Sequence, residues 1–328
     1  MNSTDTTIGV AGLGLLGRGI AACCLAHGFR VLGYTQPDQP HEKAITYIDH
    51  AISDLIDRVG FDPVLAKTWH SKFEPVESLD SFSSCDFVIE SVVEDLASKR
   101  KVFDQIEEIV GPEVPVGSNT SSIPITQLQQ DRKNPGRFVG MHWAEPAHAT
   151  RFLELIRGER TSEETFEKVV VLAKRLGKEP SIVQRDVPGF IVNRIGYAMY
   201  REAAHMVDQG VADVETIDRS CRNAFGLWAA MCGPFRWIDI TGGPELYAKS
   251  IERVLPTLCS DNERLPELLE RLKREGSGGQ LSGSGFYEYN PDSPNWQERY
   301  HEFAWRAKAL LDEFYPLGNQ QETHWLAD

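Results

Sequence analysis

The clearest indication of the fold class is the sequence Ile8-Gly9-Val10-Ala11-Gly12-Leu13-Gly14-Leu15-Leu16-Gly17. It predicts a short apolar strand that runs into a glycine turn and opens a helix. The first glycine of this spacing permits a tight turn, the second admits a pyrophosphate, and the third lets helix and strand pack closely. The helix start then offers free N–H groups to the anion. We therefore expect a bound dinucleotide that contacts Gly12, Gly14, Leu15 and Gly17, in preference to three purely structural glycines.

Beyond this stretch, short β-branched runs alternate with segments of helical periodicity, which is typical of parallel strands joined by crossover helices. The predicted strands are Ile8–Ala11, Arg30–Tyr34, Phe87–Glu90, Val114–Gly117, Phe138–His142, Leu153–Ile156 and Ser181–Gln184. The predicted helices are Leu15–Ala26, Leu96–Val110 and a helix that a capping box at Thr161 and Glu164 opens and Gly177 closes. The fold class is α/β, with a Rossmann-like, doubly wound and mostly parallel sheet.

The periodicity changes near Pro188. Asp186-Val187-Pro188-Gly189 interrupts the pattern, and the segments that follow are almost wholly helical. These segments are Phe190–Gln209, Asp213–Asn223, Leu265–Glu275 and Trp296–Tyr315. We predict a dinucleotide-binding domain over residues 1–186 and an all-α domain over 187–328, with the last helix docked on the second domain or on a partner subunit.

Composition excludes several classes of protein. The chain has 328 residues, 41% hydrophobic and 25% charged, which suits a soluble globular protein of two domains. No apolar run approaches the roughly 20 residues of a membrane helix. A formal net charge of −14 without a basic stripe argues against nucleic-acid binding.

The cysteines lack paired C-x-x-C spacing, and the polar stretch Met1–Thr7 does not resemble a secretory signal. We expect a reduced, cytoplasmic protein with no metal site.

The residues after the second predicted strand bear on which dinucleotide binds. The glycine fingerprint usually has an acidic residue there for the ribose hydroxyls, and this chain has Thr35, with Asp38 as the nearest carboxylate. Between Arg30 and Lys43 there is no Lys or Arg to hold a 2′-phosphate. The sequence favours NAD over NADP, with Thr35 at the ribose.

Further motifs carry a family resemblance. They are Ser118-Asn119-Thr120-Ser121-Ser122, Gly140-Met141-His142-Trp143, Phe152-Leu153-Glu154-Leu155 and Pro188-Gly189-Phe190-Ile191-Val192-Asn193-Arg194. In this order after a glycine fingerprint, they resemble the L-3-hydroxyacyl-CoA dehydrogenase family from Ile8 to about Tyr289. The resemblance implies NAD as cofactor, a small-molecule substrate and a homodimer.

The resemblance also implies roles at the reacting carbon. His142 matches the catalytic histidine, which takes the proton of the substrate hydroxyl while hydride leaves for the nicotinamide. Glu154 matches the carboxylate that orients this imidazole, and a Glu inside an apolar strand needs such a partner. Ser121 and Asn193 match the polar residues that hydrogen-bond the substrate oxygens. An alternative for Ser121 is a helix cap before Pro124.

On the cofactor side, Glu94 and Lys99 match residues that line the ribose and nicotinamide, and Asn119 belongs to the same expected set. Lys99 lies in the run Lys99-Arg100-Lys101, so an exposed, solvated lysine is the alternative there.

The chain departs from the family pattern at several places. Glu145 precedes Pro146 where the family commonly has Asn, and a carboxylate there affects His142 or meets a cationic substrate. In the acyl-CoA enzymes of the family, the region that corresponds to residues 42–57 helps to bind the CoA phosphates. In this chain, Lys43 is the only Lys or Arg among these residues. Trp143 and Trp228 offer ring faces to a quaternary ammonium, although core packing is the commoner fate of such residues.

We therefore expect NAD-dependent oxidation of an L-3-hydroxyacyl-CoA to the 3-ketoacyl-CoA, within fatty acid metabolism. An alternative is dehydrogenation of a free small hydroxy acid, because Leu227-Trp228-Ala229 resembles the gulonate and carnitine dehydrogenase branch of the family. A non-enzymatic NAD-binding protein is a third alternative, which the joint presence of His142, Glu154, Ser121 and Asn193 disfavours.

Overall fold

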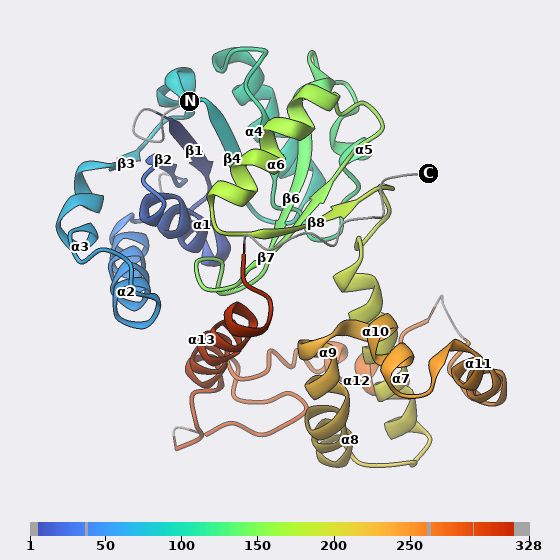
Figure 1. Cartoon of the computed structure of the whole chain (residues 1–328). Helices are drawn as coiled ribbons and strands as arrows, with labels where there is room; N and C mark the ends of the chain where they lie inside the picture. The colour runs from blue at the N-terminus through green and yellow to red at the C-terminus, as the bar shows by residue number, and fades with distance from the viewer. Residues whose placement is uncertain (1–5, 37–38, 261–263, 291, 318–328) are drawn as a thin grey trace. The chain divides into compact units, whose positions relative to one another are not determined.

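The computed structural model describes residues 6–36, 39–260, 264–290 and 292–317 of the chain. Contacts within the chain divide it into two compact units (Figure 1). The first contains Met1–Asn193 together with Phe303–Asp328, and the second contains Arg194–Glu302.

Within its described residues, the first unit contains a single eight-stranded sheet. Neighbouring strands are parallel except for β6 and β7, which are antiparallel. In sheet order the strands are β3 (Phe73–Val76), β2 (Arg30–Tyr34), β1 (Thr7–Ala11), β4 (Phe87–Glu90), β5 (Val116–Ser118), β6 (Phe138–Trp143), β7 (Phe152–Ile156) and β8 (Glu179–Val183). The expected doubly wound, mostly parallel sheet is confirmed.

Helices cover both faces of this sheet. They are α1 (Leu15–Ala26), α2 (Glu42–Val59), α3 (Leu65–Thr68), α4 (Leu96–Ile109), α5 (Ile125–Leu128) and α6 (Glu163–Arg175), with short 3-10 turns at Trp69–Ser71, Leu79–Ser84 and Pro135–Arg137. One buried cluster joins the sheet to α1, α2 and α6, and another joins it to α4 and α5. Two separately packed faces are the arrangement that a parallel sheet requires.

The connections reverse direction between β1 and β4. The chain moves from β1 outward to β2 and β3, returns to β4 beside β1, and then moves outward on the other side. In such sheets ligands bind at the carboxyl ends of the strands where the direction reverses. Ala11 and Glu90 end the two strands at this point and are register partners.

Strand β3 was not predicted, because Phe73-Glu74-Pro75-Val76 contains a proline. It lies at the edge of the sheet, where one side of the strand needs no hydrogen-bond partner and proline is tolerated. The start of α6 also differs from the prediction. Ser162 is the N-cap and accepts a hydrogen bond from Thr165 N, while the hydroxyl of Thr161 donates to the carbonyl of Phe138.

The second unit is helical. Its helices and those that enter it are α7 (Val192–Asp208), α8 (Val214–Ser220), α9 (Gly226–Met231), α10 (Gly233–Ile240), α11 (Gly243–Val254), α12 (Glu267–Arg274) and α13 (Trp296–Phe314), with a π-helical turn at Cys221–Phe225 and a 3-10 turn at Leu255–Thr257. Among the described apolar side chains of this unit, Ala204 and Leu268 are the two that are buried.

The C-terminal part of α13 belongs to the first unit, which corrects the expectation that the last helix docks on the second domain, while docking on a partner stays a prediction. Trp305 packs in a buried cluster with Ala26, Leu55 and Ala149. The first unit also extends to Asn193, so the predicted division at residue 186 differs from the division by contacts at both ends of the second unit.

Candidate active site

The glycine turn after β1 has the geometry of a phosphate cradle, by which we mean Gly12, Gly14 and Gly17. Gly12 has a φ of +104°, and a Cβ there would lie 2.5 Å from the carbonyl oxygen of Ser91. A Cβ on Gly17 would lie 1.8 Å from the carbonyl oxygen of Gly12. Gly14, the N-cap of α1, faces open space, and no side chain caps the helix. Open space beside uncapped N–H groups fits a pyrophosphate.

Thr35 lies directly after β2 and is buried. Its hydroxyl donates to the carbonyl of Gln39 at 2.9 Å and lies 3.2 Å from His41 Nε2. Thr35 therefore links the end of β2 to Gln39 and His41. Asp38, the nearest carboxylate in the sequence, lies outside the described residues.

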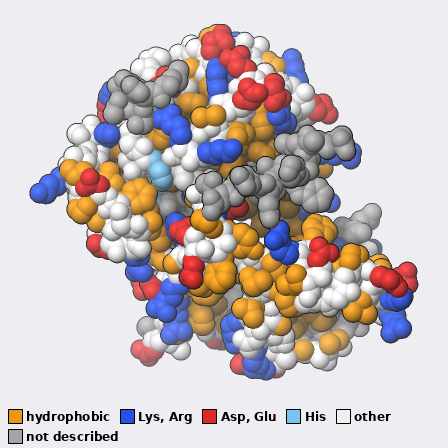
Figure 2. Space-filling view, viewed as in Figure 1, with side chains coloured by type: hydrophobic (Ala, Val, Ile, Leu, Met, Phe, Trp, Pro, Cys, Tyr) orange, Lys and Arg blue, Asp and Glu red, His pale blue; other side chains and the backbone are white. Residues whose placement is uncertain are grey.

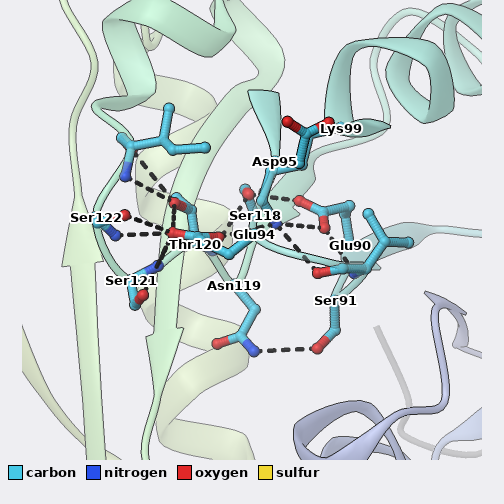
Figure 3. Close-up of polar contacts among 12 residues, drawn as sticks. Glu90, Ser91, Glu94, Asp95, Lys99, Ser118, Asn119, Thr120, Ser121 and Ser122 are labelled. Carbon is cyan, nitrogen blue, oxygen red and sulfur yellow. Dashed lines mark hydrogen bonds and ion pairs between the residues drawn. The ribbon is translucent and has the colours of Figure 1, made fainter. Parts of the chain in front are cut away.

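A buried charge network lies beside the cradle at the ends of β4 and β5 (Figure 3). Glu90 ends β4 and is fully buried, and its Oε1 accepts from Lys99 Nζ at 2.7 Å. Ser118, at the end of β5, donates to its other oxygen at 2.6 Å. Lys99 is 1% exposed, so the solvated alternative for this lysine is wrong. Its ammonium neutralises Glu90 and also lies 3.3 Å from Glu94 Oε2.

The Glu94 carboxylate accepts hydrogen bonds from the segment that follows β5 (Figure 3). Its Oε1 accepts from the hydroxyl of Thr120 at 2.7 Å and from the N–H groups of Ser121 and Ser122, each at 2.9 Å. Burial alone would raise the pKa of Glu94, but these hydrogen bonds and the Lys99 ammonium lower it to about 2. Ser121 does not cap α5, whose N-cap is Pro124. The network instead fixes Ser121 at the carboxyl edge of the sheet.

Asn119 joins the ends of three strands. Its amide donates to the Ser91 hydroxyl at 3.0 Å, and its carbonyl accepts from the N–H of Trp143 at 2.9 Å. Ser91 follows β4, Asn119 follows β5, and Trp143 ends β6. Asn119 therefore ties the cradle side of the edge to the strand that carries His142.

His142 and Glu154 form a hydrogen-bonded pair. They are direct register partners on the antiparallel strands β6 and β7, and His142 Nδ1 lies 2.7 Å from Glu154 Oε2. Cross-strand pairing therefore brings the two side chains together. Glu154 is 1% exposed and His142 8%. The carboxylate partner places the ring proton on Nδ1 and leaves Nε2 as a proton acceptor.

The turn before α7 holds this carboxylate in place. Glu154 Oε1 accepts from the N–H groups of Ile191 and Val192, at 3.1 and 3.0 Å. Gly189 and Phe190 both have positive φ, 77° and 51°, which is uncommon for a residue such as phenylalanine. The strained turn aims the two N–H groups at Glu154 and places the Phe190 ring 5.7 Å from that of His142.

Asn193 reaches Ser121 across the sheet edge. Its Nδ2 donates to the Ser121 carbonyl at 2.8 Å. The four expected catalytic residues are thus connected in two pairs, His142 with Glu154 and Asn193 with Ser121. The segment from Gly189 to the first residues of α7 links the two pairs, since its N–H groups bind Glu154 and Asn193 is the second residue of the helix.

Glu145 and Trp143, two of the residues at which the chain departs from the family pattern, both have contacts within the first unit. Glu145 precedes a cis peptide bond to Pro146, and its Oε1 accepts from the hydroxyl of Tyr47 on α2 at 3.2 Å. Trp143 is 2% exposed, with Lys178 Nζ 5.0 Å from its ring centroid, so its ring face already has a cation. In the second unit, the Trp228 ring stacks on the Trp237 ring, with the two ring centroids 5.7 Å apart.

Sequence reasoning missed Glu90 and Lys178. Glu90 closes the apolar run Phe87-Val88-Ile89, and a carboxylate in such a place needs a cation or donors. Lys178 is 3% exposed, and its ammonium donates to the carbonyls of Ala147 and Thr150. Its signal was weaker, because a lysine after a helix-closing glycine is commonly exposed.

In the part of the chain that the structure describes, no helix is both long and apolar enough to cross a bilayer.

Comparison with known proteins gives one consistent family. Residues 7–187 match the model described as 3-hydroxyacyl-CoA dehydrogenase, NAD binding domain, and residues 189–289 match the C-terminal domain of the same enzyme. The chain is 34% identical over 289 residues to a 3-hydroxybutyryl-CoA dehydrogenase of Bradyrhizobium diazoefficiens, covering 88% of this chain and 96% of the relative.

A second kind of relative acts on a different substrate. The chain is 33% identical over 285 residues to the 5-formyl-3-hydroxy-2-methylpyridine 4-carboxylate 5-dehydrogenase of Mesorhizobium japonicum, covering 87% of this chain and 91% of the relative. A solved structure of such a 5-dehydrogenase, described as an NAD+-dependent dismutase, matches with a TM-score of 0.84 and 30% identity over 94% of this chain and 98% of that chain. With both domain models matched in order, the chain belongs to the 3-hydroxyacyl-CoA dehydrogenase family of NAD-dependent enzymes that act on CH–OH groups.

Proposed function

We propose that the protein oxidises the secondary hydroxyl of an L-3-hydroxyacyl substrate, with His142 as the group that takes the hydroxyl proton. The observation that carries this proposal is the buried pair of His142 and Glu154, held by two backbone N–H groups. NAD, when bound, would supply the acceptor for the hydride that leaves the carbon bearing this hydroxyl. The cradle fits the cofactor by its open space and uncapped N–H groups.

The chain's own residues divide the remaining work. His142 accepts the proton at Nε2, and Glu154 stabilises the imidazolium and keeps the ring oriented. Asn193 and the hydroxyl of Ser121 orient the substrate oxygens, since the network around Glu94 fixes the Ser121 backbone. We assign the cofactor side of the site to Gly12, Gly14, Leu15, Gly17, Thr35, Glu94 and Asn119, with Lys99 acting from the interior through Glu94.

For the rest of the substrate, a CoA thioester is the first candidate, because a 3-hydroxybutyryl-CoA dehydrogenase is among the relatives. Such a substrate would place the enzyme in fatty acid metabolism. A free small hydroxy acid is the second candidate, because the relative with a TM-score of 0.84 is named for a free carboxylate. Helix α2 also supports it, since Lys43 and Arg58 are outnumbered there by Glu42, Asp49, Asp54 and Asp57.

The test is NADH formation by the purified protein with L-3-hydroxybutyryl-CoA, 3-hydroxybutyrate, L-gulonate and L-carnitine in separate assays. Turnover of the thioester alone supports the first candidate, and turnover of a free acid alone supports the second. Turnover that survives unchanged in His142→Gln contradicts the proposed role of the imidazole.

We also propose a homodimer formed through the second unit. Hydrophobic side chains are widespread on the visible surface of this part of the chain (Figure 2). Large exposed side chains in the second unit include Tyr197, Tyr200, Leu227, Met231, Phe235, Ile240 and Leu246. A surface of this kind marks an interaction site.

Six free cysteines, three of them buried, support a reducing, cytoplasmic location.

A further inference from the structure

One arginine of the first unit has no role in the site described above. Arg18 follows the last glycine of the cradle and is half-buried on α1. In the part of the chain that the structure describes, its guanidinium makes no hydrogen bond or ion pair, and Nε is also buried from solvent. Its one close partner is the ring of Tyr47, whose centroid lies 4.2 Å from the guanidinium carbon. A guanidinium has five donors in a plane, so Arg18 holds unused hydrogen-bonding capacity.

The surroundings of Arg18 connect it to the strand that carries His142. The Tyr47 hydroxyl donates to Glu145 and lies 3.5 Å from His148 Nδ1. One residue beyond Arg18, a Cβ on Gly19 would lie 3.2 Å from the Cβ of Ala147. Arg18 therefore lies where α1, α2 and the segment after β6 meet, and this segment begins directly after Trp143.

The ring beneath the guanidinium is uncharged at neutral pH. Burial and the Glu145 carboxylate raise the pKa of Tyr47 far above its usual range. The contact is thus a cation–π contact, which leaves the edges of the guanidinium plane for an acceptor. Because an unpaired, partly desolvated donor is unfavourable, the arrangement favours a ligand that supplies acceptor oxygens.

We propose that Arg18 is a specificity-determining residue that binds an anionic group of the substrate, either the carboxylate of a free acid or a phosphate of a CoA thioester. The proposal rests on the proposed function, since it concerns the substrate of the same site. The uncapped N–H groups at the start of α1 would hold the pyrophosphate of the cofactor. The guanidinium lies against Tyr47, on the side of the segment after β6.

The experiment uses calorimetry to measure the binding of 3-keto compounds to the full-length protein loaded with NAD+. A 3-keto compound and NAD+ are both in the oxidised state, so no hydride transfer occurs during the measurement. Acetoacetate is compared with neutral acetoacetamide, and acetoacetyl-CoA with acetoacetyl-N-acetylcysteamine, which lacks the phosphates. For Arg18→Met we expect the charged member of one pair to bind about 10- to 100-fold more weakly, and its neutral counterpart to bind as in the wild type. Arg18→Lys should lie between, because it keeps the charge and loses the planar fork.

Arg30→Met is the matched control. It removes one positive charge from an exposed ion pair with Glu74 and should change none of the four affinities. Selective loss of acetoacetate identifies a carboxylate site, and selective loss of acetoacetyl-CoA identifies a phosphate site. Equal losses within both pairs, weaker NAD+ binding, no change in Arg18→Met, or no binding by the wild type would overturn the inference. Failure of the proposed function gives a different result, in which the probes bind normally but wild-type turnover is absent.

Discussion

At the scale of single residues, His142 depends on a partner that is itself fixed. Glutamine cannot take up a proton, so His142→Gln should lower kcat by about 10²- to 10⁴-fold while NADH affinity stays the same. Glu154→Gln should give a smaller loss in kcat, since it keeps a hydrogen bond to Nδ1 and loses the charge that stabilises the imidazolium. Steady-state kinetics and NADH titration measure both effects. Normal turnover in His142→Gln would remove the imidazole from the mechanism.

Lys99 illustrates how one cation stabilises the interior of the site. Lys99→Met leaves Glu90 buried without its counter-charge, and breaking a buried pair in this way costs about 3–5 kcal/mol. Lys101→Met, two residues along the same helix and exposed, should lie within about 0.5 kcal/mol of the wild type. Urea unfolding at neutral pH compares the two variants. Equal stabilities would show that Glu90 is satisfied by its hydrogen-bond donors alone.

Glu94 predicts a pH dependence. Its pKa falls from the ordinary 4.5 to about 2 in the folded protein, so its carboxylate stabilises the fold above pH 4.5 and this contribution is lost as the pH falls toward 2. The side chain is 35% exposed, so solvent screening keeps the contribution small. The stability gap between the wild type and Glu94→Gln should narrow from pH 5 to pH 3 in urea titrations. Glu77→Gln, an exposed control, should show no such narrowing, and a constant gap for Glu94→Gln would contradict the prediction.

At the scale of elements, α13 is held to the first unit at both ends of its docked part. Arg151, directly before β7, donates to the carbonyls of Leu311 and Tyr315 at 2.9 and 2.7 Å, which places a cation at the carboxyl end of the helix. Trp305, 6% exposed, packs against His148 with ring centroids 5.6 Å apart. The helix therefore supports the segment between β6 and β7.

Trp305→Ala should destabilise this docking by about 3–5 kcal/mol, because it leaves a large cavity. Phe303→Ala is the matched control, since Phe303 is 64% exposed and its truncation should have little effect. Hydrogen exchange of the α13 amides measures the docking directly. Unchanged exchange in Trp305→Ala would mean that Arg151 alone holds the helix.

At the scale of the whole molecule, the described part of the second unit has few buried apolar side chains for its length. Phe235 on α10 is 82% exposed, and the proposed homodimer would bury side chains of this kind. Light scattering should give twice the chain mass of 36.8 kDa for the wild type. Phe235→Asp should shift the equilibrium to the monomer, and Val64→Asp, an equally charged change at an exposed residue of the first unit, should not. A monomeric wild type would contradict the homodimer.

The cofactor turn, the alternation of strands and helices, and the residue types of the candidate site could all be predicted from the sequence. Those features depend on spacings of a few residues, such as the glycine fingerprint and the period of each helix, which a single chain displays openly. Strand β3 could not be predicted in this way. Its proline has a low propensity for strands, and it is tolerated because β3 lies at the edge of the sheet.

Which of these residues contact one another depends on the packing of segments that are distant in the sequence. The pairing of His142 with Glu154 depends on an antiparallel register between β6 and β7, and the burial of Lys99 depends on Glu90 at the end of β4. The docking of Trp305 joins residues separated by more than a hundred positions. No local pattern encodes such contacts, because their free energy comes from removing surfaces and charges from water, and that happens only when the distant segments are already packed together.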